Sequence, residues 1–259
     1  MKVTLLGCGT SVGVPALGAA GWGRCDPEDS RNRRQRCALL LEQDGYRLLV
    51  DAGPDIRNQL LAAGITSLDA VLITHTHSDH VAGMDDLRTF YFPEKRKIPI
   101  YGTAKTLDQL QDRFNYLFTK QSTSPSYFEP SLEGRQISHD MVLELGPFQI
   151  QVLLQHHGRV DSLGFIFNNI VGYSTDVVDM PSHNFYLLSG LKLWIVEALR
   201  ASPHQAHAHF DLTFEWIERC RPERAVLTHL GLEADYVETL ALCPKGVEPG
   251  IDGMVFEFN

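Results

Sequence analysis

A short stretch of the chain gathers four side chains that can bind metal ions. Residues 73–83 read ITHTHSDHVAG, so three imidazoles and one carboxylate fall within six positions. Neutral imidazole and carboxylate are the ligands that a borderline divalent ion such as zinc or manganese prefers. His75 and His77 can point the same way in an extended chain, which leaves Asp79 and His80 for a second ion. The stretch therefore predicts half of a hydrolytic site for two metal ions.

Two other interpretations of this stretch are weaker. A solvated loop that happens to be rich in histidine would be rare, because 11 histidines in 259 residues give H-x-H-x-D-H by chance in about one chain in a thousand. A zinc finger is not indicated either, since none of the five cysteines forms a C-x-x-C pair. We therefore prefer the hydrolytic metal site.

The elements that must position these ligands are apolar strands, each ending beside a side chain that can act in a metal site. The apolar run 68–73 predicts a strand that leads directly to the first histidines. Similar runs precede other polar side chains: 46–50 before Asp51, 148–155 before His156 and His157, 170–174 before Thr175 and Asp176, and 225–228 before His229. We expect such strand-end ligands to converge on one edge of a sheet.

Three of these assignments stay open from the residues alone. Asp51 can cap a turn, or it can accept a hydrogen bond that orients a metal-bound histidine. Neighbouring strand residues face opposite ways, so only one of His156 and His157 can reach the metal, and periodicity favours His157. The segment 203–211 carries three histidines that cannot all be ligands: His204, His207 and His209.

The rest of the chain predicts alternating strands and helices. Strands are expected at 2–6, 98–102 and 192–197, with strand segments in 247–258. Hairpins are expected at 37–50 about Asp44-Gly45, at 141–155 about Gly146-Pro147 and at 163–174 about Asn168-Asn169. Helices are expected at 54–63, 106–118 and 212–220. Asp211 is expected to cap the last helix. The basic run 31–36 can meet a substrate phosphate or form a solvated face, and the loop 121–130 receives no role.

Length and composition bound the class of protein. With 44% hydrophobic and 21% charged residues and no linker or repeat, residues 1–259 are expected to form one α/β domain. The net charge of −9 works against unspecific attraction to nucleic acid or to an anionic membrane. We find no signal peptide or membrane-spanning stretch, and the cysteine count is odd, so we expect a soluble cytoplasmic protein.

Taken together, the ordered set Asp51, His75, His77, Asp79, His80, His157, Asp176 and His229 resembles the metallo-β-lactamase superfamily. The resemblance implies a four-layer αββα sandwich with two divalent metal ions, zinc or manganese, on the rim between two sheets. It implies that His75, His77 and His157 hold one ion, that Asp79, His80 and His229 hold the other, and that Asp176 bridges them. In this arrangement Asp51 orients a ligand.

Within the superfamily the chain is most similar to the PhnP-type phosphodiesterases, which act on the cyclic phosphate of 5-phosphoribosyl 1,2-cyclic phosphate. The shared segments are 9–15, 33–37, 174–176, 209–212 and 227–229. The resemblance implies that His209 assists at the substrate phosphate, that Arg34 binds the substrate, and that two copies of the chain can pair. One departure is that only Cys25 remains of that family's cysteine cluster for a structural zinc, so this zinc is expected to be missing.

The resemblance therefore predicts hydrolysis of a small phosphodiester, a cyclic ribose or nucleotide phosphate, by attack of hydroxide at phosphorus. Asp79 and His209 are the expected catalytic side chains, with His209 acting on the leaving oxygen. A tRNase Z-like nuclease shares the 9–15 loop and the ligands, but the charge of −9 is poorly suited to gripping RNA. A metal-binding module without catalysis is the remaining alternative, and the complete ligand set argues against it.

Overall fold

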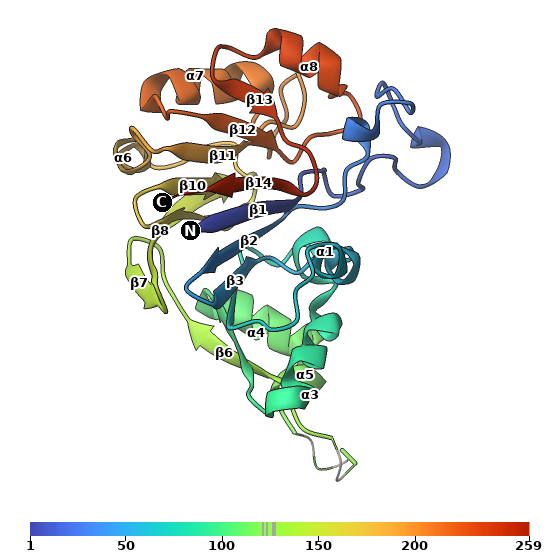
Figure 1. The fold of residues 1–259 in the computed structure, drawn as a ribbon, viewed down its shortest axis with the longest axis vertical. Coiled ribbons are helices and arrows are strands. Elements are labelled where there is room, and N and C mark those ends of the chain that lie inside the picture. Colours follow the sequence, from blue (N-terminus) through green and yellow to red (C-terminus); the bar gives the residue numbers. More distant parts are fainter. Residues whose placement is uncertain (121, 123, 126–127, 259) are drawn as a thin grey trace.

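Two β-sheets face each other in the middle of the molecule, and helices cover the outer face of each sheet (Figure 1). The structure is a computed structural model that describes residues 1–120, 122, 124–125 and 128–258. The order of layers is helix, sheet, sheet and helix. This arrangement confirms the predicted αββα sandwich.

Each sheet has seven strands. In spatial order the first sheet contains β14 (Met254–Glu257), β1 (Lys2–Gly7), β2 (Ala38–Gln43), β3 (Tyr46–Val50), β4 (Ala70–Leu72), β5 (Ile98–Gly102) and β6 (Leu132–Gln136). The second contains β13 (Val247–Pro249), β12 (Ala225–Thr228), β11 (Leu193–Glu197), β10 (Val171–Ser174), β9 (Val160–Phe167), β8 (Phe148–His157) and β7 (Val142–Leu145). Because β14 pairs with β1, the two ends of the chain lie side by side (Figure 1).

The helices fall into two groups according to the sheet that they follow in the chain. With the first sheet lie η1 (Gly18–Ala20), η2 (Ser30–Asn32), α1 (Ile56–Ala62), α2 (Ser78–Val81), η3 (Met84–Phe90), α3 (Tyr91–Glu94), α4 (Ala104–Arg113) and α5 (Asn115–Phe118). With the second lie α6 (Ser182–Leu187), α7 (Phe210–Cys220) and α8 (Tyr236–Leu242). Among the described helices, none has the length and apolar character needed to span a bilayer.

The strands read as nearly continuous apolar runs because both faces of each sheet are buried. In β2, Leu39 and Leu41 point into the core between the sheets, whereas Leu40 packs under the helices of the first layer. In β11, Ile195 enters the core between the sheets and Trp194 packs under the helices of the other layer. The alternation of strand side chains therefore builds three apolar layers from the same few strands.

The predicted hairpins form at the expected turns. Asp44 and Gly45, between β2 and β3, have φ of 50° and 80°, and Asn168 and Asn169, between β9 and β10, have φ of 53° and 54°. A two-residue turn with positive φ at both positions matches the twist of the paired strands. Residue types that tolerate the left-handed conformation were thus enough to predict these two turns from the sequence.

Several elements differ from the sequence prediction. The expected helix 106–118 is divided, because α4 ends at Arg113 and α5 begins at Asn115. Helix α7 begins at Phe210 with His209 as its N-cap, so Asp211 lies in the first turn and is not the cap. Strand β6 was not predicted, and part of the loop 121–130 lies outside the described residues.

The strand directions bring the predicted ligands to one rim. β3 and β4 are parallel, and so are β10, β11 and β12. β8 and β10 are both antiparallel to β9 and therefore run in the same direction. The carboxyl ends of these strands meet where the two sheets adjoin. That residues 1–259 form one domain stays a prediction.

Candidate metal centre

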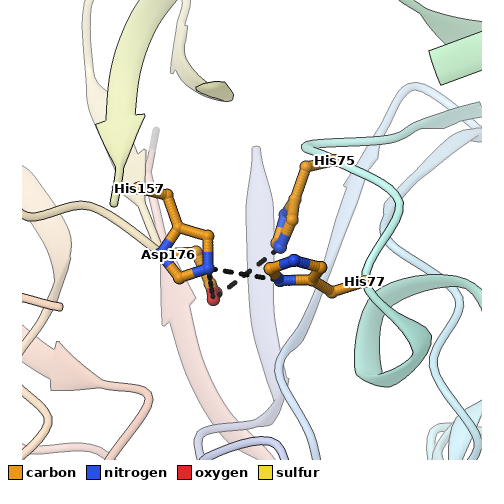
Figure 2. A group of neighbouring side chains, drawn as sticks. All are labelled: His75, His77, His157 and Asp176. Carbon is orange, nitrogen blue, oxygen red and sulfur yellow. Dashed lines mark hydrogen bonds and ion pairs between the residues drawn. The ribbon is translucent and has the colours of Figure 1, made fainter. Parts of the chain in front are cut away.

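Seven side chains predicted as metal ligands lie together at this rim in two groups. The first group contains His75, His77, His157 and Asp176, and the second contains Asp79, His80, Asp176 and His229. Within each group the candidate ligand atoms lie within 4.8 Å of one another. Figure 2 shows the first group, whose three imidazoles and one carboxylate point toward a common space. The two groups come from the ends of β4, β8, β10 and β12 and from the short helix α2.

Asp176 lies between the two groups and turns one oxygen toward each. Its Oδ1 is 3.8 Å from Nε2 of His75 and 3.5 Å from Nε2 of His157. Its Oδ2 is 3.0 Å from Nε2 of His80 and 3.6 Å from Nε2 of His229. A carboxylate in this position can join two cations.

His77 and Asp79 complete the groups. Nδ1 of His77 lies 3.2 Å from Nε2 of His157. Oδ2 of Asp79 lies 3.2 Å from Nε2 of His80 and 3.8 Å from Nε2 of His229. Each group therefore combines imidazole nitrogens with carboxylate oxygen, the donor set suited to zinc or manganese.

In two ligand histidines, the ring nitrogen that faces away from the centre contacts an acceptor oxygen of the protein. Nδ1 of His80 is 2.7 Å from the buried carboxylate of Asp51, which also accepts hydrogen bonds from the backbone and hydroxyl of Thr74 at 2.9 Å. Nδ1 of His157 lies 2.7 Å from the carbonyl oxygen of Ala206. Such contacts fix the tautomer and the orientation of a metal-bound imidazole. Asp51 thus has the position predicted for an orienting carboxylate.

Buried ring nitrogens without a hydrogen-bond partner indicate that these side chains suit a metal ion. Nε2 of His75 and Nε2 of His229 are buried and make no hydrogen bond to the described residues, and the Asp176 oxygens near them are 3.8 and 3.6 Å away. Buried polar atoms almost always have a partner, so these two nitrogens require one. A divalent cation at each group would supply it.

Three residues of the site have an uncommon backbone conformation. Asp51, Asp176 and His229, which follow the ends of β3, β10 and β12, have φ of 64°, 52° and 55°. Residues other than glycine rarely adopt positive φ, and where they do the strain is often tied to function. Here the conformation turns each side chain from the end of its strand toward the rim.

Charge interactions within the cluster shift the pKa values of its members. Burial lowers the pKa of His75 well below its usual value, so this ring stays neutral. Burial alone would also lower the pKa of His80 and of His229, but the Asp176 carboxylate beside them raises both well above the usual value, and a bound cation would displace their protons. Burial alone would raise the pKa of Asp176, but the imidazoles of His229 and His80 hold it well below its usual range. The Asp176 carboxylate is therefore ionised.

A further pair, Glu197 and His207, lies against the ligands. Oε1 of Glu197, at the end of β11, is 2.5 Å from Nδ1 of His207 and 3.0 Å from Nδ1 of His229. The His207 ring stacks on that of His229, with centroids 4.8 Å apart, and its centroid is 4.6 Å from that of His157. Glu197 is fully buried, whereas His207 is partly exposed. His207 thus lies at the edge of the metal centre with a small part of its ring exposed.

The structure does not bring the other two predicted substrate contacts to the centre. His209 is the N-cap of α7, and no contact links its side chain to the ligands in the described part of the chain. Arg34 is only 2% exposed, and its guanidinium donates to Asn32 Oδ1 at 3.2 Å and contacts Cys25 Sγ at 3.9 Å. Arg34 therefore cannot reach a substrate without a rearrangement of its surroundings.

The basic run around Arg34 is engaged within the protein. Arg31 pairs with Asp29 at 2.7 Å, Arg33 lies over the ring of Trp22, and Arg36 pairs with Asp55 at 2.9 Å. These contacts favour a structural role for residues 31–36 over phosphate binding.

His156 and His157 are separated as strand geometry requires. His157 is buried at the centre, whereas His156 is turned outward, with its Nδ1 2.9 Å from Asp161. Glu197 was not predicted, and His207 was a candidate with His204 and His209 but was passed over for His209. The strand 192–197 ends in an acid exactly as the strands before Asp51 and Asp176 do, so the pattern that identified those residues also fits Glu197.

Comparison with known proteins defines the class. Residues 46–230 match the family profile described as a β-lactamase superfamily domain. Given this match, the fold and the two ligand groups, the chain belongs to the metallo-β-lactamase superfamily. A crystal structure of a new diphosphatase from the PhnP family has 30% sequence identity and a TM-score of 0.88, over 100% of this chain and 98% of that one. This similarity confirms the PhnP branch of the superfamily.

Two curated relatives carry other names. An octanoyltransferase of Porphyromonas gingivalis is 35% identical over 98% of this chain and 51% of its own length. A ribonuclease Z of Bradyrhizobium diazoefficiens is 33% identical over 60% of this chain and 50% of its own length. The chain thus spans about half the length of these relatives.

Proposed function

We propose that this protein is a phosphodiesterase that uses two divalent metal ions, zinc or manganese, to hydrolyse a small phosphodiester such as a cyclic ribose or nucleotide phosphate. The observation that carries the proposal is the sharing of Asp176 between two buried ligand groups, with one oxygen turned to each. Two-metal sites of this kind clamp the attacking and leaving oxygens of a displacement at phosphorus.

The chain's own residues have distinct parts in this proposal. The ions, when bound, would lower the pKa of a shared water toward about 7 and so supply hydroxide at neutral pH. Asp79, whose Oδ2 faces the second group, orients the attacking water by accepting a hydrogen bond. His207 gives a proton to the leaving oxygen, because Glu197 holds its Nδ1 and leaves Nε2 for the substrate. This is the role that the sequence assigned to His209.

The comparisons support chemistry at phosphorus. The structural neighbour is described as a diphosphatase and one relative as a ribonuclease, and both words denote cleavage of a bond to phosphorus. The name octanoyltransferase belongs to a protein of about twice the length of this chain, which matches only half of it.

The test is a substrate panel with protein loaded with manganese or zinc. It contains bis-p-nitrophenyl phosphate, cyclic ribose phosphates, nucleoside cyclic phosphates, a nucleoside diphosphate sugar, precursor tRNA and a chromogenic cephalosporin. We expect hydrolysis of the small diesters that requires added metal and is lost on chelation. Hydrolysis of the cephalosporin alone would contradict the proposal.

Ribonuclease Z activity is the second candidate, because a ribonuclease Z is among the relatives. The charge of −9 opposes binding to RNA through its phosphates. Preferential cleavage of precursor tRNA in the panel would favour this candidate.

The cellular location and partners are proposed from indirect observations. All five cysteines are free thiols, which supports a reducing compartment such as the cytoplasm. Pairing of two copies of the chain stays a prediction, to be checked by light scattering.

A further inference from the structure

A cavity opens from the metal centre between helix α4 and the β8–β9 hairpin. Its volume is about 430 Å³, which is within the usual range for ligand sites. Two candidate metal ligands, His75 and His77, are among its lining residues, so the cavity adjoins the metal centre. Nothing in the proposed reaction at phosphorus uses the rest of this space.

One wall of the cavity is a row of polar side chains along α4. Lys105, Gln109 and Arg113 are spaced by four residues and therefore lie along one stripe of the helix. Nη1 of Arg113 donates to the carbonyl oxygen of Thr76 at 2.6 Å, and Gln109 accepts a hydrogen bond from the hydroxyl of Thr76. Because Thr76 stands between His75 and His77, the Arg113 end of the row is the end nearest the ions.

Lys105 stands at the other end of the row. Eight residues of α-helix separate it from Arg113, a rise of about 12 Å. No carboxylate pairs with its ammonium group in the described part of the chain, although the protein as a whole carries a net charge of −9. The first turn of a helix also disfavours a cation, so local stability does not account for a lysine here.

The charges around the cavity leave Lys105 uncompensated. Asp161 is an acid of the lining; Nδ1 of His156 lies 2.9 Å from its carboxylate, and it makes no ion pair with Lys105 within the described residues. His139, also in the lining, is paired with Asp140 at 2.7 Å. The side of the cavity away from the ions therefore presents a free positive charge.

The opposite wall is largely apolar. Leu154, Val160 and Leu163 of the β8–β9 hairpin line it. Apolar side chains on one wall and a lysine at the far end fit an organic group, such as a ring, that carries a negative charge away from the reacting phosphorus.

We propose that this cavity is the specificity subsite and that Lys105 binds an anionic group, phosphate or carboxylate, on the non-reacting part of the substrate. The inference rests on the proposed phosphodiesterase function. It assigns Lys105 to substrate selection and leaves the bond-breaking step to the metal centre.

The experiment compares chromogenic diesters that differ only at the distal position. They are thymidine 5′-(p-nitrophenyl phosphate) with a 3′-hydroxyl, with a 3′-phosphate and with a 3′-O-carboxymethyl group. We expect the wild type to prefer a charged ester by kcat/KM, and the preference to fall about tenfold in Lys105→Gln. Lys105→Arg should retain it, and the phosphate and carboxylate arms show which anion is bound.

A matched control removes another exposed lysine. Lys97→Gln, outside the cavity lining, makes the same change in net charge and should leave the preference unaltered. Absence of a preference in the wild type, an unchanged preference in Lys105→Gln, or an equal loss in Lys97→Gln would overturn the inference while bis-p-nitrophenyl phosphate is still cleaved. If no diester is cleaved, the phosphodiesterase proposal itself fails.

Discussion

His207 and His209 are two positions apart, but only His207 lies against the metal ligands. We expect His207→Gln to keep its bound metal and to lose about a hundredfold or more in kcat, because the variant lacks the proton donor for the leaving oxygen. His209→Gln is the matched control, since the His209 side chain makes no capping hydrogen bond to α7. Metal analysis measures the bound ions, and steady-state kinetics on a nucleoside cyclic phosphate, whose leaving alkoxide needs a proton, measure the turnover of both variants. A larger loss of turnover in His209→Gln would restore His209 as the catalytic residue.

At the residue scale, the sequence was informative where side-chain type and chain position agree. His75, His77, Asp79 and His80 are adjacent in the chain, so their chemistry is visible without a fold. The choice among His204, His207 and His209 was not, because it depends on where the chain enters α7. His207 is placed by Glu197 at the end of β11 and by backbone hydrogen bonds of Ala208 with Val177 and Leu199, which are contacts between distant segments.

Among the elements, the segment after β3 and the helix α2 meet without space for a side chain. A Cβ added at Gly53 would lie 2.0 Å from the carbonyl oxygen of Asp79. We expect Gly53→Ala to lower the free energy of unfolding by about 2 to 3 kcal/mol and to weaken metal binding, because Asp79 must move.

Gly134→Ala is the control for this steric prediction. A Cβ at Gly134 would meet its nearest neighbour at 3.4 Å, which is an ordinary contact. Urea unfolding and metal titration compare the two variants. Equal stability of both would show that the loop at Gly53 adapts, contrary to the expectation.

Asp252 joins three elements far from the metal ligands in sequence. Its carboxylate accepts from the backbone of Cys8 at 3.0 Å and of Gln35 at 2.6 Å, and burial raises its pKa to about 6. The unfolded value is near 4, so the folded state holds this proton more tightly. Its stabilising contribution is present below about pH 4 and is lost as the pH rises through 6.

Asp252→Asn tests this pH dependence. For metal-free protein, we expect the stability of the wild type relative to the variant to fall by about 2 to 3 kcal/mol between pH 4 and pH 7. Urea unfolding at several pH values measures this difference, in which the titration of other groups cancels. Parallel curves for the two proteins would mean that Asp252 has an ordinary pKa.

Helices, strands and turns were predictable from the sequence where a short stretch of residues favours one backbone conformation. The hairpins at Asp44-Gly45 and Asn168-Asn169 were predictable because their turns need residues that accept positive φ. β6 was not, because its sequence Leu-Glu-Gly-Arg-Gln has neither an apolar run nor alternation, and pairing with β5 determines it. The burial of Arg34 was not predictable for the same reason, because it depends on packing between loops that are distant in the chain.

On the scale of the whole molecule, bound metal should stabilise the fold. Ligands from both sheets meet at the rim, so ions that bind only the folded state stabilise it by about 2.7 kcal/mol at 100 times Kd. We expect chelation to lower Tm by about 5 to 10 °C in a domain of this size. Asp176→Asn should show a smaller change. An unchanged Tm of the wild type would indicate that the ions are weakly bound.

A calorimetric scan of the metal-loaded protein tests the prediction of one domain. A single transition, with equal calorimetric and van't Hoff enthalpies, is expected if residues 1–259 unfold together. Two separated transitions would show that the chain contains two parts that unfold independently, contrary to the prediction.

The central claim is that Asp176 joins two metal ions, and anomalous diffraction from a crystal grown with manganese tests it most directly. We predict two peaks about 3.5 to 4 Å apart on either side of the Asp176 carboxylate. His75, His77 and His157 should surround one peak, and Asp79, His80 and His229 the other. A single peak, or peaks away from Asp176, would contradict the two-metal account.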